Sequence, residues 1–150
     1  MEWTEYFLKI AEVVKLKSKD KNTQIGVVLV GSNNEIISTG YNSFPRGIDD
    51  NVNERQGRPE KYYWFEHAER NAIYNAALIG VSTNGAKMYM TCGIPCADCA
   101  RGIINAGIKE IWMLGGGSNQ LKWEESAERS IKMFEEAGVG VFYYTKSLDN

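Results

Sequence analysis

The sequence predicts an α/β fold in which helices cover both faces of one mixed, five-stranded sheet. Three observations support this expectation. Two short apolar runs adjoin across a polar turn, which predicts an antiparallel hairpin. The later apolar runs are separated by segments of helical periodicity, which predicts parallel neighbours joined by right-handed crossovers. A helix between the fourth and fifth strands makes that pair parallel, so we expect a three-layer α/β/α arrangement.

The first part of the chain supplies a helix and the hairpin. Aromatic and aliphatic residues at helical spacing predict an amphipathic helix over about 2–17. A β-branched run predicts a strand at 25–30, and glycine and asparagine at 31–34 predict a turn into a strand at 35–41. Residues 42–65 contain prolines, glycines and many polar side chains, which predicts one long loop. Loops of that length are usually functional or disordered, and the aromatic run at 62–65 argues against complete disorder.

The remainder of the chain alternates helices with strands. Each expected helix stops at a glycine, the residue that most readily takes the left-handed conformation at a helix end. No repeat or linker interrupts the pattern, so we expect a single domain over 1–150. The expected elements are a helix at 67–79, a strand at 87–91, a helix at 96–106, a strand at 108–114, a helix at 120–137 and a strand at 139–144.

Composition narrows the class of protein. With 43% hydrophobic and 24% charged residues, the chain is typical of a globular protein, and its net charge of −2 argues against a general nucleic-acid binder. No apolar stretch is long enough to span a membrane, and the N-terminus does not read as a signal peptide. Three cysteines without an export signal favour reduced thiols in a cytoplasm, that of the host if the chain is phage-encoded.

One imidazole and two thiols form a candidate zinc site. His67 is the only histidine of the chain, and Cys96 and Cys99 are three residues apart at a predicted helix start that Pro95 precedes. Three protein ligands leave a fourth position on zinc open, and an open position can bind and activate water. Glu69, two residues after the histidine, diverges from it around the helix and is better placed to exchange protons with that water.

Each of these features also has a simpler interpretation. A lone histidine is usually an ordinary polar or packed residue, and a C-x-x-C pair can be redox-active or structural. Their combination with Glu69 matches the signature of zinc deaminases, H-x-E followed by P-C-x-x-C. Cys92 precedes the predicted helix and is better interpreted as a buried apolar residue than as a ligand. The glycines at 115–117 lack the Lys-Ser/Thr of a phosphate loop, so we expect only a flexible loop there.

Over about residues 3–140, the chain resembles the cytidine deaminase superfamily and, within it, the deoxycytidylate deaminases. The zinc motif marks the superfamily. The Gly-Tyr-Asn-x-x-Pro stretch, joined to His-Ala-Glu-x-Asn-Ala-Ile, narrows the resemblance to the deoxycytidylate branch. The segments that carry it are 18–20, 24–26, 40–47, 67–73 and 104–108.

The resemblance implies hydrolysis of the 4-amino group of dCMP to give dUMP, a precursor for thymidylate synthesis, and ammonia. One zinc per chain, held by the histidine and two cysteines, would activate the water, and Glu69 would shuttle protons. The resemblance also implies a sugar contact for Asn42, a backbone contact to the pyrimidine for Ala68, and a position near the phosphate for Ser18 and Lys19.

The resemblance further implies a homo-hexamer activated by dCTP and inhibited by dTTP, with Mg²⁺ accompanying the triphosphate. Gly40, Tyr41, Arg46 and Gly47 lie in the segment that resembles the effector region, where Ser43 replaces the usual glycine. Some phage members hold a second zinc in the long loop. Residues 43–66 contain neither cysteine nor histidine, so we expect no second zinc.

Other functions remain open at this stage. A tRNA or polynucleotide deaminase would share the zinc chemistry but would need a basic surface. Deaminases of other free nucleotides, of guanine or of riboflavin precursors are further candidates. A zinc-binding interaction module without catalysis is the alternative from a different class.

Overall fold

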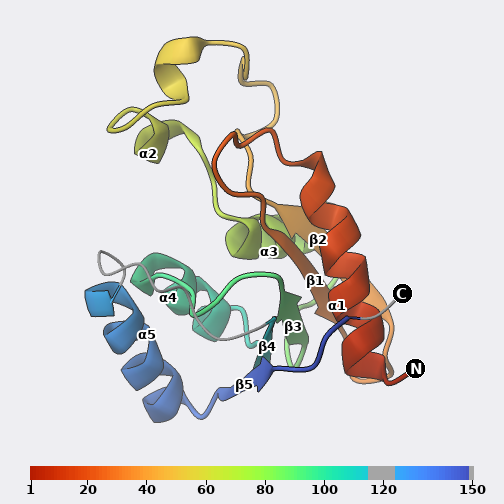
Figure 1. Ribbon diagram of the computed structural model, residues 1–150. Coiled ribbons are helices and arrows are strands. Elements are labelled where there is room, and N and C mark those ends of the chain that lie inside the picture. The colour runs from red at the N-terminus through yellow and green to blue at the C-terminus, as the bar shows by residue number, and fades with distance from the viewer. Residues whose placement is uncertain (115–123, 149–150) are drawn as a thin grey trace.

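The computed structural model describes residues 1–114 and 124–148. Its sheet has the strand order β2-β1-β3-β4-β5, with β1 antiparallel to both β2 and β3, and with β3, β4 and β5 parallel (Figure 1). The mixed sheet and the parallel fourth and fifth strands confirm the prediction. The strands are β1 (Gly26–Val30), β2 (Ile36–Tyr41), β3 (Lys87–Met90), β4 (Glu110–Leu114) and β5 (Gly140–Tyr144).

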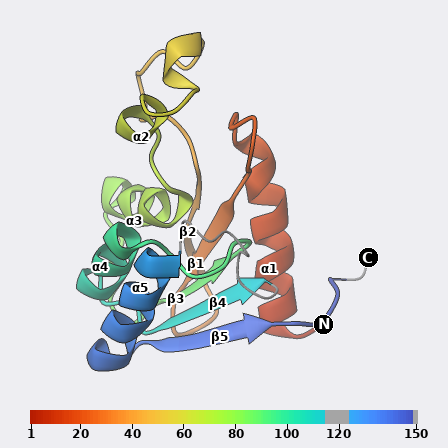
Figure 2. The ribbon, with the colours of Figure 1, turned by 60° about the vertical axis from the view of Figure 1, so that its left-hand side comes forward.

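Helices cover both faces of this sheet (Figure 2). Helix α1 (Trp3–Val14) lies on one face, and α3 (Ala68–Ile79), α4 (Ala97–Asn105) and α5 (Glu124–Ala137) lie on the other. Strand β1 is buried along its whole length because its alternate side chains enter two different cores. Val27 and Leu29 pack under the three helices, whereas Val28 and Val30 pack under α1.

The element boundaries differ from the predictions mainly at the ends. The N-terminal helix stops at Val14 and continues as a 3₁₀ turn over Lys15–Lys17. Strand β4 begins two residues later than expected, because the amide of Ile108 still donates a hydrogen bond to the Ile103 carbonyl at the end of α4. The glycines at 115–117 and the expected helical residues 120–123 lie outside the described residues.

The segment expected to be one long loop contains two short helical turns. These are η2 (Asn53–Arg55) and α2 (Lys61–Trp64), which stand above the start of α3 in Figure 1. In the described part of the chain, no helix combines the length and the apolar character that crossing a bilayer requires.

Candidate metal and substrate site

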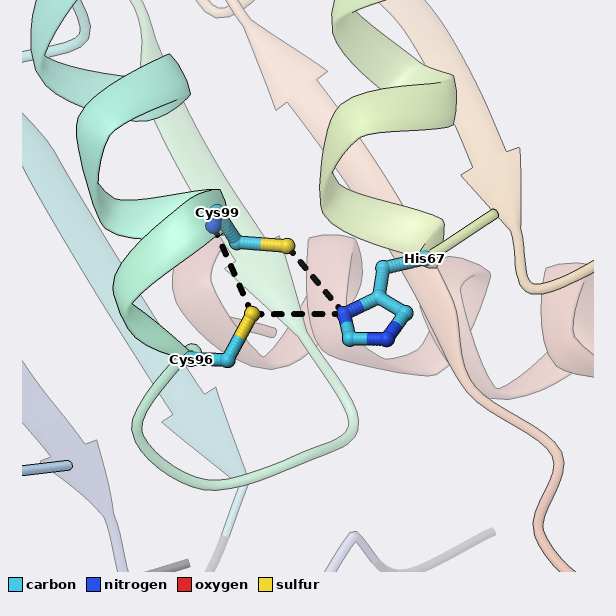
Figure 3. Close-up of side chains that lie close together, drawn as sticks. All are labelled: His67, Cys96 and Cys99. Atoms are coloured by element: carbon cyan, nitrogen blue, oxygen red, sulfur yellow. Dashed lines mark hydrogen bonds between the residues drawn. The ribbon is translucent and has the colours of Figure 1, made fainter. Parts of the chain in front are cut away.

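Three side chains from two helix starts meet at the candidate metal centre (Figure 3). The Nδ1 atom of His67 lies 3.3 Å from the Cys99 sulfur and 3.5 Å from the Cys96 sulfur. In a tetrahedral zinc site with Zn–N of about 2.0 Å and Zn–S of about 2.3 Å, such atoms lie about 3.5 Å apart. The donor set and its spacing therefore fit zinc.

Local sequence places these ligand atoms at two helix N-termini. His67 is the N-cap residue of α3, and Cys96 is the N-cap residue of α4. The sulfur of Cys96 accepts a hydrogen bond from the backbone amide of Cys99, at 3.4 Å. Both helix starts carry partial positive charge toward the cluster, which favours thiolate over thiol.

The pKa shifts of the cluster residues agree with a thiolate at the start of α4. Hydrogen bonds from Cys99 and His67 lower the pKa of the Cys96 thiol to about 4. The pKa of His67 is raised, chiefly by its hydrogen bond with Cys96. The pKa of Cys99 is also raised, because its thiol donates to Cys96 and is buried. Zinc binding would therefore release the proton from this second thiol.

Glu69 lies in the first turn of α3, with only 4% of its surface exposed. Burial raises the pKa of its carboxyl, and the nearby positive charge of His67 opposes that rise. A raised pKa suits a carboxyl that must both accept and donate protons. Glu69 can serve as such a group beside the metal cluster.

A cleft of about 1280 Å³ opens beside the cluster. One part of its wall is formed by His67, Glu69 and Cys96, and another part by residues of the 42–65 segment. Cys92 also lines the cleft while packing against the core below it, and burial raises the pKa of its thiol well above the ordinary value. Cys92 does not belong to the cluster of potential ligands among the described residues.

An ion-pair network that sequence analysis missed ties the two helix starts together. The guanidinium of Arg70 lies 2.6 Å from the Glu66 carboxylate and 3.9 Å from that of Asp98. Glu66 also accepts a hydrogen bond from the amide of His67. The i, i+4 spacing of Glu66 and Arg70 was the available signal in the sequence.

Asn42 lies at the cleft with its carboxamide fully hydrogen-bonded. Its Nδ2 donates to the Thr23 carbonyl and to Asp20, and its Oδ1 accepts from the amide of Ile25. Ser18 is buried beneath it and donates to the Asn42 carbonyl, at 2.7 Å. These bonds brace the segment that precedes β1 against the end of β2.

Three of the four predicted substrate residues lie outside the cleft lining. Lys19 pairs with Asp50 at 2.8 Å, and neither it nor Ser18 lines the cleft. Ala68 is fully buried as the first residue of α3. Their contacts with a nucleotide stay predictions.

The four residues predicted for effector binding also lie outside the cleft lining. Gly40 packs against α3, and the Tyr41 carbonyl accepts a hydrogen bond from Asn71. Arg46 donates to Asn75 on the same helix, and Gly47 has a φ of 82°. These contacts describe how the segment is held to α3.

Known proteins share both the fold and the zinc motif. A family model described as the cytidine and deoxycytidylate deaminase zinc-binding region matches residues 1–114. The deoxycytidylate deaminase of Homo sapiens is 38% identical over 144 residues, a match that covers 93% of this chain and 78% of the human protein. The dCMP deaminase of the cyanophage S-TIM5, solved with dCMP and dUMP, aligns with a TM-score of 0.75 and 25% identity, covering 93% of this chain and 95% of the phage chain.

The fold and the His/Cys/Cys cluster define a zinc-binding deaminase domain. The chain belongs to the cytidine and deoxycytidylate deaminase family. Membership makes it a hydrolytic deaminase, as the sequence motifs predicted.

Proposed function

We propose that this chain hydrolyses dCMP to dUMP and ammonia. The observation that carries the proposal is the position of Glu69, a buried carboxyl in the same cleft as a cluster fit for zinc. The names of the human and cyanophage relatives support dCMP as the substrate. The net charge of −2 supports a free nucleotide over a polynucleotide.

The proposed roles follow from the chemistry of each side chain. His67, Cys96 and Cys99 would hold zinc, which supplies the Lewis acidity that activates water when it is bound. Glu69 takes a proton from the attacking water and passes protons to the pyrimidine N3 and to the departing amine. The water oxygen ends on C4 of the base, and the C4–N bond breaks to release ammonia.

Substrate contacts complete the proposal. Asn42 stands on the cleft wall, where its carboxamide would contact the sugar by exchanging one of its present hydrogen bonds. The backbone of Ala68 would meet the pyrimidine edge from the start of α3. These contacts would all come from the single domain proposed over 1–150.

An ammonia-release assay tests the proposed substrate. The zinc-loaded protein is given cytidine, CMP, dCMP and dCTP in turn, and we expect the highest kcat/KM for dCMP. A higher kcat/KM for any of the other three would overturn the substrate assignment. It would leave zinc-dependent deamination standing.

Regulation and assembly are part of the proposal. The segment with Gly40, Tyr41, Arg46 and Gly47 would bind dCTP or dTTP with Mg²⁺ in a cytoplasmic homo-hexamer that supplies dUMP for thymidylate synthesis. Measuring activity as each triphosphate is added tests the regulation. Light scattering on the protein as it elutes from a size-exclusion column tests the hexamer. Loss of the dTTP effect in Arg46→Ala would support the location, and an unchanged dTTP effect would contradict it.

A further inference from the structure

Among the described residues, one cation on the wall of the cleft has no carboxylate partner. Three described cleft residues carry a permanent cation: Arg58, Lys61 and Arg70. Lys61 pairs with Asp20, and Arg70 pairs with Glu66 and Asp98. Arg58 forms no ion pair with any carboxylate of the described residues. Its guanidinium lies instead over the ring of Tyr62, 5.5 Å from the centroid.

A short buried ion pair fixes the segment that carries Arg58. The Lys61 ammonium lies 2.7 Å from the Asp20 carboxylate, and the two side chains are only 17% and 7% exposed. Asp20 also accepts a hydrogen bond from Asn42 at the cleft wall. Because Lys61 follows Arg58 by three residues, this contact holds the Arg58 segment at the edge of the cleft.

We propose that Arg58 binds the 5′-phosphate of the nucleotide substrate. A phosphate monoester carries close to two negative charges at neutral pH, and a guanidinium binds it through two parallel hydrogen bonds. The exposed Arg58 supplies that group without first breaking an ion pair. The Tyr62 ring limits the orientations of the guanidinium, as aromatic faces do for arginine. This assignment rests on the proposed function, because it concerns the same cleft.

Lys19 is the competing cation, since the family resemblance points to Ser18 and Lys19 for the phosphate. Its ammonium is occupied by Asp50 at 2.8 Å, and it does not line the cleft. Arg55 provides a matched control for Arg58, because it belongs to the same segment but is not part of the cleft lining. The Arg55 guanidinium stacks 3.9 Å over Trp64.

The test compares Arg58→Ala, Arg58→Lys, Lys19→Ala and Arg55→Ala in the zinc-loaded protein. Two comparisons are measured for each variant. One is kcat/KM for dCMP relative to kcat/KM for deoxycytidine, and the other is the dissociation constant of dUMP relative to that of deoxyuridine. In Arg58→Ala we expect the preference for the nucleotide over the nucleoside to fall about tenfold or more, which is the effect of losing a charge-assisted hydrogen bond. Arg58→Lys should keep part of it, since lysine retains the charge but not the fork.

Several results would overturn the assignment. The first is a preference for the phosphorylated ligand that is the same in Arg58→Ala as in Arg55→Ala. The second is a loss in Arg58→Ala that is equally large for the nucleotide and for the nucleoside. The third is a loss of dCTP binding with no change for dCMP or dUMP. A loss of preference in Lys19→Ala with none in Arg58→Ala would move the phosphate to Lys19. The dUMP and deoxyuridine measurements need no turnover. A wild-type protein inactive on dCMP would therefore reject the proposed function while still testing Arg58.

Discussion

The backbone of Gly40 on β2 packs directly against Ala72 on α3. A Cβ atom on Gly40 would lie 2.8 Å from the Ala72 Cα and 2.5 Å from the Ala68 carbonyl oxygen. Both neighbours are backbone atoms that no side-chain rotation can move. This close approach holds α3 against the sheet, and α3 carries Glu69 and has His67 as its N-cap residue.

The close approach predicts a stability defect in Gly40→Ala. Forcing α3 away from β2 should destabilise the protein by about 1–3 kcal/mol, the usual cost of overpacking. Chemical denaturation followed by circular dichroism measures this change. Gly57→Ala is the control, because a Cβ at Gly57 meets nothing within 4 Å. Equal stability of the two variants would show that the contact between β2 and α3 relaxes freely.

A second prediction concerns proton transfer by Glu69. Replacing it with glutamine keeps the size of the buried side chain but removes the ionisable group, so kcat for dCMP should fall about 10²- to 10⁴-fold. Zinc content should stay near the wild-type value. Glu125→Gln, on the exposed face of α5, should behave like wild type. Full activity of Glu69→Gln would refute the proton-shuttle role of this carboxyl.

Metal content separates the three thiols. We expect one zinc per chain by elemental analysis, lost in Cys96→Ser and in Cys99→Ser but retained in Cys92→Ser. Chelation should also lower the midpoint of thermal unfolding, because zinc binds the folded cluster in preference to the unfolded chain. Two tightly bound zinc ions per wild-type chain would contradict the expectation of a single site.

The ion pair between Asp20 and Lys61 predicts a pH-dependent stability. Burial alone would raise the pKa of Asp20, but hydrogen bonds with Lys61 and the amides of Asn22 and Thr23 hold that pKa below its ordinary 3.8. A lowered folded-state pKa stabilises the protein above the ordinary pKa, and this stabilisation is lost as the pH falls through the lowered value. Asp20→Asn should therefore be less stable than wild type at neutral pH.

The difference in unfolding free energy between wild type and Asp20→Asn should shrink as the pH is lowered from about 7 to about 3. Urea denaturation of the metal-free proteins at both pH values measures it, so that loss of zinc in acid does not enter the comparison. Glu128→Gln, on an exposed part of α5, is the control. A difference for Asp20→Asn that is independent of pH would show that the carboxylate contributes no charge-dependent stability.

The sheet could be predicted from the sequence because its signals are local. Helical segments between apolar runs imply parallel β3, β4 and β5, and the observed register joins Met88 to Ile111 as parallel neighbours. The meeting of His67 with Cys96 and Cys99 could be inferred for a similar reason. Each motif opens a helix, and zinc chemistry requires the two motifs to converge.

The cleft wall could not be predicted in the same way. Arg58, Lys61 and Tyr62 lie in a segment with no strong periodicity, and their positions depend on a contact with Asp20, about forty residues earlier in the chain. Nothing local in the sequence distinguishes Arg58 from the neighbouring Arg55. In the structure, Arg58 lines the cleft and lies over Tyr62, whereas Arg55 lies outside the lining and stacks over Trp64.

The convergence of two helix starts on one metal cluster has a consequence for oxidative damage. Thiolates there offset the positive ends of α3 and α4, and they would also hold the zinc ion. Alkylation of Cys96, or its oxidation to an uncharged sulfenic acid, would remove both contributions at once and leave two like partial charges opposed across the cluster. The thiol with the most acidic pKa is also the most reactive. A single peroxide event there would cost the protein its metal and loosen the junction of two helices.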